Sequence, residues 1–124
     1  MRLFQLLAIA LLFIQCSLNI PDAVVIEMEN LPEKVDYNYH IKPILSDRCY
    51  QCHGPDEKTR KAGLRLDLEE VAFSRLKSGN KAFSKGNPFK SESLHRILST
   101  DLEIKMPPPE SNLELSSKEK AILI

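Results

Sequence analysis

The sequence has no tryptophan and contains only five phenylalanines and three tyrosines. Aromatic side chains therefore contribute little to a core, and a large apolar cofactor at its centre would compensate for their scarcity. The chain also lacks an excess of either charge, because 17 Lys and Arg residues balance 17 Asp and Glu residues. A nucleic-acid-binding protein needs a clear basic excess, so the composition argues against that class. The length of 124 residues suits one compact domain.

No apolar run in the sequence is long enough to cross a bilayer. The N-terminal run from Leu3 to Ile14 is interrupted only by Gln5. As a helix this run would rise about 18 Å, well short of the roughly 30 Å hydrocarbon layer. Arg2 precedes it, and a short apolar run behind a positive charge is typical of an export signal. We therefore predict a signal peptide at residues 1–19 and export of the protein to the periplasm.

Cys16 directly follows the apolar run, at the place where a bacterial lipoprotein carries its lipidated cysteine. Gln15 stands where such sites usually hold a small residue, and no Ala-x-Ala cleavage site lies nearby. A cysteine that is discarded with the signal is therefore the alternative interpretation. We expect contact with a membrane only through the signal or through a lipid anchor on Cys16.

Residues 20–35 contain Pro21 and Pro32 together with acidic residues and show no sustained period, which predicts a linker. Residues 36–124 form the expected domain, whose apolar spacing predicts an all-α fold of four or five short helices with long loops. The expected helices run from Ile41 into a pair of cysteines, from Asp67 to Gly79, from Ser91 through Leu98, and from the Ser116–Glu119 capping box onward.

The chemistry of the chain is concentrated in Cys49-Tyr50-Gln51-Cys52-His53, a C-x-x-C-H pentad typical of haem attachment. Two cysteines three residues apart on a helical turn can each add to one vinyl group of a haem. His53 then lies under the iron and offers a ring nitrogen as an axial ligand. The pentad predicts covalent haem c, one per chain.

Other readings of the two cysteines explain less of the pattern. A structural zinc site needs four ligands, and no second C-x-x-C or H-x-x-x-H pair is present. A thioredoxin-like pair requires a βαβ context, which the sequence lacks. A disulfide between Cys49 and Cys52 is compatible with export, but it leaves His53 without a role.

Met106 is the candidate for the second axial ligand of the iron. It precedes three prolines, Pro107 to Pro109, in a segment that cannot be an α-helix, and its thioether is a soft ligand suited to haem iron. A lone methionine can also fill a core. His40 and His95 are the alternative ligands, although a surface or core position is the more usual one for such a histidine.

A basic run follows the pentad and consists of Lys58, Arg60, Lys61 and Arg65. Arg65 is the member expected to reach inward because Leu64 and Leu66 flank it. It could pair with a haem propionate, and the run as a whole could steer an acidic redox partner. The alternative is an ordinary solvated loop.

Several short strings occur in a fixed order around the pentad, and together they resemble the planctomycete-type cytochrome c domain. These strings are Val35–Asn38, Ile41–Ser46, Cys49–Lys58, Arg60–Asp67 and Met106–Pro109. The resemblance covers residues 36–124 and implies a class I-like cytochrome c fold, wrapped around one covalent haem with His53 and Met106 as axial ligands. In that family the domain usually opens a longer protein. We therefore expect this chain to be a fragment of one, with its last helix cut short after Ile124.

The resulting hypothesis is an electron carrier without enzymatic activity of its own, whose partner is a redox protein or a downstream domain. Two alternatives stay open. One is a haem-based sensor or catalytic module with an open sixth position, and the other is a haem-binding interaction module.

Overall fold

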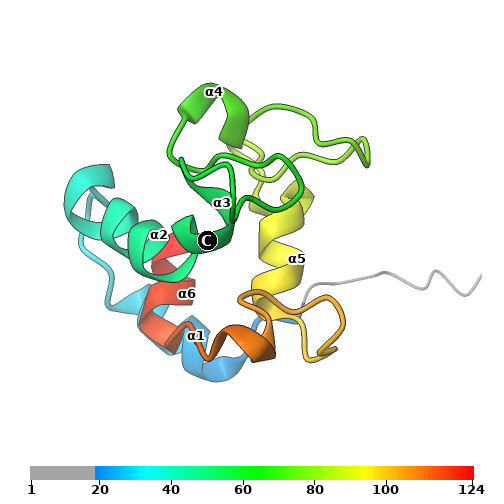
Figure 1. Ribbon diagram of the computed structural model, residues 1–124. Coiled ribbons are helices and arrows are strands. Elements are labelled where there is room, and N and C mark those ends of the chain that lie inside the picture. The colour runs from blue at the N-terminus through cyan, green and yellow to red at the C-terminus, as the bar shows by residue number, and fades with distance from the viewer. Residues whose placement is uncertain (1–18) are drawn as a thin grey trace, which may run out of the picture.

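The computed structural model describes residues 19–124, and over this range the chain is helical and contains no strand (Figure 1). This confirms the helical class predicted from the apolar spacing. The elements in chain order are α1 (Asp22–Glu29), the π-helical turn η1 (Tyr37–Ile41), α2 (Lys42–Arg48), α3 (Tyr50–His53), α4 (Glu69–Ala72), the 3-10 turn η2 (Pro88–Lys90), α5 (Glu92–Leu98), the 3-10 turn η3 (Pro109–Ser111) and α6 (Ser117–Leu123).

The predicted signal segment and Cys16 lie outside the described residues, so both stay predictions. Within residues 19–124, none of the helices combines the length and the apolar character that crossing a bilayer requires.

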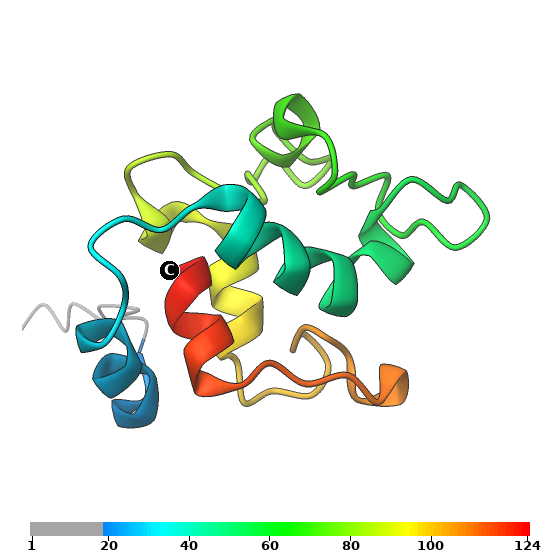
Figure 2. The same cartoon turned by 90° about the vertical axis from the view of Figure 1, so that its left-hand side faces the viewer.

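The segment predicted to be a linker, residues 20–35, contains helix α1, which the lack of a sustained period did not predict. Val24 is its only buried residue and is 1% exposed, whereas Val25 and Ile26 remain at the surface. A helix that buries a single side chain produces no repeating apolar pattern, so this helix could not be predicted from periodicity. The helix packs against α6, which also contacts α5 (Figure 2).

Helix α2 leads directly into the pentad, as the sequence predicts, although the helix is broken at Cys49. Pro43 occupies the first turn of α2, where its missing N–H group costs no hydrogen bond. Cys49 has φ −126° and ψ −35°, outside the helical range, and separates α2 from the single turn of α3. Ile44 and Leu45 are buried and fix α2 on the core.

The helix expected between Asp67 and Gly79 is much shorter, because α4 ends at Ala72. Asp67 does not cap it. Its carboxylate accepts a hydrogen bond from Arg65 Nε at 3.2 Å instead, and Leu68 stands at the cap position without a capping side chain. Downstream, the Leu76 amide donates to the Asn80 carbonyl at 2.7 Å, so the chain turns back well before a longer helix could form.

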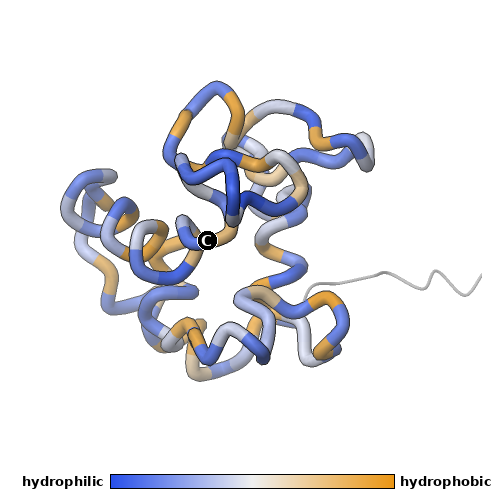
Figure 3. The backbone as a smooth tube through the Cα atoms, viewed as in Figure 1, coloured by the Kyte–Doolittle hydropathy of each residue, from blue (hydrophilic) through white to orange (hydrophobic). Residues whose placement is uncertain are grey.

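The last two α-helices agree closely with the sequence. Leu94, Ile97 and Leu98 are buried on one face of α5, and hydrophobic and hydrophilic residues alternate along this helix (Figure 3). In α6 the predicted capping box is complete. The Glu119 amide donates to Ser116 Oγ at 3.2 Å, and the Ser116 amide donates to Glu119 Oε2 at 2.7 Å.

Two apolar clusters make up the core, and α2 contributes neighbouring residues to both. The first cluster consists of Ile44, Leu94, Ile97, Leu98 and Leu115. The second consists of Leu45, Leu64, Leu66, Ala72 and Ala82, with Cys49 and Tyr50 packed against it. The end of α2 is therefore held from two directions, and the pentad begins at this fixed point.

Candidate functional site

The five residues of the pentad occupy the single turn that follows α2. The Cys52 and His53 amides both donate to the Cys49 carbonyl, at 3.1 Å and 2.8 Å, which closes the turn. Both thiols are free and half-buried. The local backbone therefore presents the two sulfur atoms and the imidazole from one compact unit.

The Cys49 thiol lies in an apolar environment. Burial raises the pKa of Cys49 to about 11, although the nearby Arg48 guanidinium lowers it. The thiol is therefore uncharged at neutral pH. A thioether at the same position carries no charge at any pH, so burial of this sulfur costs little once it is alkylated.

His53 is half-buried, but its Nδ1 atom is shielded from solvent and has no hydrogen-bond partner among the described residues. Burial lowers the pKa of His53, and this effect outweighs the opposing interaction with the Lys61 backbone. The ring is therefore neutral near pH 7, which is the form that binds a metal ion. A buried polar atom without a partner is uncommon in a folded protein and calls for a ligand or another functional explanation.

Gly54 follows the pentad at a position where only glycine fits. A Cβ atom at this residue would lie 2.4 Å from the Tyr50 carbonyl oxygen and 2.8 Å from the Tyr50 Cβ. Neither atom belongs to a flexible side-chain end, so the close approach of the two backbone segments excludes a side chain here.

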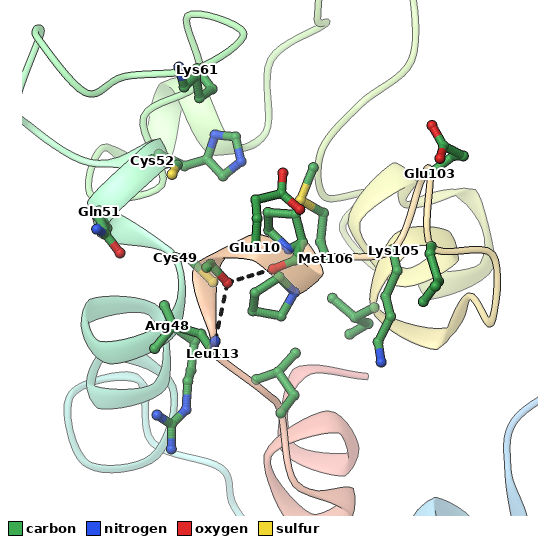
Figure 4. Close-up of a pocket in the computed structure, with 17 residues that line it drawn as sticks. Arg48, Cys49, Gln51, Cys52, Lys61, Glu103, Lys105, Met106, Glu110 and Leu113 are labelled. Carbon is green, nitrogen blue, oxygen red and sulfur yellow. Dashed lines mark hydrogen bonds between the residues drawn. The ribbon is translucent and has the colours of Figure 1, made fainter.

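A cavity of about 730 Å³ opens beside the pentad (Figure 4). Cys49 and Cys52 reach it from the pentad, and Met106 reaches it from the loop between α5 and η3. A second cavity of about 340 Å³ adjoins this region, and five leucines are among the residues that line it. The two cavities share the lining residues Cys49, His53, Lys61, Ile97 and Met106.

The loop that carries Met106 is fixed on both sides. The Met106 amide donates to the Arg96 carbonyl of α5 at 3.1 Å. On the other side, the Ser111 hydroxyl donates to the Pro108 carbonyl at 2.7 Å and accepts from the Leu113 amide at 3.2 Å (Figure 4). Pro107 is buried. The thioether is therefore presented to the cavities from a tethered loop with restricted backbone freedom.

The structure places the other predicted ligands away from both cavities. His40 Nδ1 accepts a hydrogen bond from the Asp36 amide at 2.8 Å, and His95 Nε2 lies 3.0 Å from the Phe89 carbonyl oxygen. Neither histidine lines either cavity. Arg65 does not line them either, because its guanidinium is paired with Asp67. Lys61 is the member of the basic run that lines both.

The residues around the two cavities fit a haem. Two free thiols three residues apart, a neutral half-buried imidazole and a thioether form the donor set, and the larger cavity has the volume of a typical cofactor pocket. Among residues 19–124, no three His, Cys, Asp or Glu side chains are grouped as ligands of a free metal ion.

Sequence reasoning missed most of the apolar lining, including Ile97, Leu102, Leu113 and Leu115. In the sequence, Ile97 is one of the residues on the apolar face of a helix. The apolar pattern is the same whether such a side chain lines a cavity or fills the core, so the sequence cannot separate the two. Gly54 was also missed, although its place directly after the pentad is a signal that the backbone comes close to another segment there.

Comparison with known proteins identifies the family. The family model for planctomycete cytochrome C matches residues 49–110, from the first pentad cysteine to just beyond Met106, and this range is half of the chain. No curated protein and no solved structure matches. The matched range contains the pentad, Met106 and the proline run. The chain therefore belongs to the planctomycete cytochrome C family and carries a c-type cytochrome domain.

Proposed function

We propose that this protein is an exported c-type cytochrome that holds one haem c and transfers single electrons. The observation that carries the proposal is that His53 and Met106, 53 residues apart in the sequence, line the same two cavities as the attachment cysteine Cys49. When bound there, the haem would supply a one-electron couple between ferrous and ferric iron.

The side chains divide the work of holding the cofactor. Cys49 and Cys52 would form the thioethers, and the neutral His53 ring would provide one axial ligand. The Met106 thioether would provide the other, and as a soft donor it favours the ferrous state and raises the reduction potential. With His53 and Met106 both bound to the iron, no coordination position would remain for a substrate, so we propose that this domain carries electrons and has no enzymatic activity.

We also propose that the site works outside the cytoplasm and exchanges electrons with a redox partner protein or with a further domain. The support for export is the apolar run that follows Arg2 and the place of Cys16 directly after this run. Lipid on Cys16 would hold the domain at a membrane surface, whereas removal of the signal would release it into the periplasm.

The test is a spectroscopic redox titration of the protein, co-expressed with a cytochrome c maturation system. We expect a reversible one-electron transition and a low-spin spectrum in both oxidation states. A high-spin ferrous spectrum with rapid binding of carbon monoxide would overturn the electron-carrier proposal, because it would show an open sixth position and favour a sensor or catalytic role.

A further inference from the structure

The end of the pentad is covered by the segment that follows it. The Lys61 amide donates to the Cys52 carbonyl at 2.7 Å, and the Leu66 amide donates to the His53 carbonyl at 2.8 Å. Carbonyls at the end of a helix have no partner within the helix and must find donors elsewhere. The returning chain therefore supplies the donors for both motif residues.

The next two carbonyls are bound by one side chain, that of Arg60. Its Nε donates to the Gly54 carbonyl at 3.1 Å, and a terminal guanidinium nitrogen donates to the Pro55 carbonyl at 2.7 Å. Four consecutive carbonyls, those of residues 52–55, thus accept hydrogen bonds from residues 60–66. The loop between these segments leaves α3 and returns beside it (Figure 2).

Arg60 differs from its neighbours in the loop. Residues 55–59 are all exposed, whereas Arg60 is half-buried and directed back toward the pentad. The planar guanidinium can donate in two directions from one rigid group, and it uses both of these donors here. A lysine has the same charge but not the fixed fork, so it cannot reproduce both hydrogen bonds in this geometry.

We propose that Arg60 is a positioning residue for the axial histidine, an inference that rests on the proposed function. By fastening Gly54 and Pro55 to the returning loop, its side chain keeps the backbone of His53 in place. The imidazole then has one orientation toward the iron. Without Arg60, two backbone hydrogen bonds at Cys52 and His53 and the packing of Leu64 and Leu66 would still join the returning segment to the pentad, but the Gly54 and Pro55 carbonyls would lose their donors.

The test compares the haem-loaded wild type with Arg60→Ala, Arg60→Lys and Lys58→Ala. Lys58 is the matched control because its removal takes the same charge from the same loop, and its side chain is exposed. The readouts are hydrogen exchange at the Lys61 and Leu66 amides, the reduction potential, and the hyperfine-shifted His53 ring resonances.

For Arg60→Ala we expect exchange at these amides to accelerate roughly tenfold, which corresponds to the loss of charge-assisted hydrogen bonds. The potential should fall and the His53 resonances should shift. Arg60→Lys should give intermediate values, and Lys58→Ala should match the wild type.

The inference is overturned if amide exchange, potential and His53 resonances in Arg60→Ala or in Arg60→Lys equal those of the wild type. It is also overturned if Lys58→Ala changes these readouts as much as Arg60→Ala does, because the loss of charge alone would then explain the effect. If Arg60→Ala fails to acquire haem, the same readouts on Arg60→Lys decide the question. Failure of the proposed function is distinguishable, because it shows in the wild type as the absence of attached haem, whatever residue stands at position 60.

Discussion

Arg48 and Glu119, 71 residues apart in the sequence, are joined by a hydrogen bond from Nε to Oε1 of 3.1 Å. Arg48 is the last residue of α2 and immediately precedes Cys49, whereas Glu119 lies in the first turn of α6. The same carboxylate accepts the Ser116 amide at 2.7 Å to complete the capping box. One side chain therefore begins α6 and ties it to the helix that carries the pentad.

This arrangement predicts a pH-dependent contribution to stability. Burial tends to raise the pKa of Glu119, but the Ser116 hydrogen bonds and Arg48 more than offset this, so the pKa lies below its ordinary value of 4.5. A lowered carboxyl pKa stabilises the fold above the unfolded-state pKa, and this contribution disappears as the pH falls through the folded-state value. At pH 7, Glu119→Gln should reduce the free energy of unfolding by about 1 kcal/mol.

The measurement is chemical denaturation of wild type and Glu119→Gln from pH 7 down to pH 3. The difference between them should shrink as the pH drops below the ordinary carboxyl value. A difference that stays constant over the whole range would show that the charge of Glu119 does not contribute.

Gly54→Ala should disturb the end of the pentad, because the new Cβ would lie 2.4 Å from the Tyr50 carbonyl oxygen. We expect a loss of about 1–3 kcal/mol in stability, typical of overpacking, together with a changed haem absorption spectrum. Gly63→Ala is the control. Gly63 has φ +63° but open space around it, so alanine there should cost about 1 kcal/mol and leave the spectrum unchanged. Thermal unfolding and absorption spectra check both variants, and an unaltered spectrum in Gly54→Ala would contradict this account.

Met106→Ala should leave the haem covalently attached but shift the spectrum toward high spin and lower the reduction potential. It should also remove the weak absorption band at long wavelength that a bond between methionine sulfur and ferric iron gives. The affinity for carbon monoxide should rise by tenfold or more, because the gas no longer has to displace the Met106 thioether from the iron. A tenfold rise corresponds to about 1.4 kcal/mol of binding free energy. His40→Ala and His95→Ala are the controls, because hydrogen bonds with Asp36 and Phe89 engage these rings away from the cavities. A spectrum that responds to either histidine and not to Met106 would assign the sixth position to histidine.

The elements that the sequence predicted well are those with a local cause. Leu94, Ile97 and Leu98 recur at helical spacing on the apolar face of α5, and the Ser116–Glu119 capping box predicts the start of α6. The prediction of haem attachment at Cys49, Cys52 and His53 is equally local, since five consecutive residues carry the whole chemical pattern.

The features that the sequence did not predict depend on contacts between distant segments. Helix α1 has one buried residue, Val24, and packs against α6. Asp67 pairs with Arg65 instead of capping α4, and the hydrogen bond from the Leu76 amide to the Asn80 carbonyl turns the chain back early. The role of Arg60 belongs to this group as well. A basic residue in an exposed loop looks solvated until the fold brings the Gly54 carbonyl within reach of its guanidinium.

The most direct test of the central claim is the mass of the intact protein after co-expression with a cytochrome c maturation system. The wild type should gain the mass of one haem and retain it through acid-acetone extraction. Cys49→Ala and Cys52→Ala should each retain at most one thioether, and His53→Ala should lose the low-spin spectrum. Haem that is fully extracted from the wild type, or a mass without any haem, would contradict covalent attachment at Cys49 and Cys52.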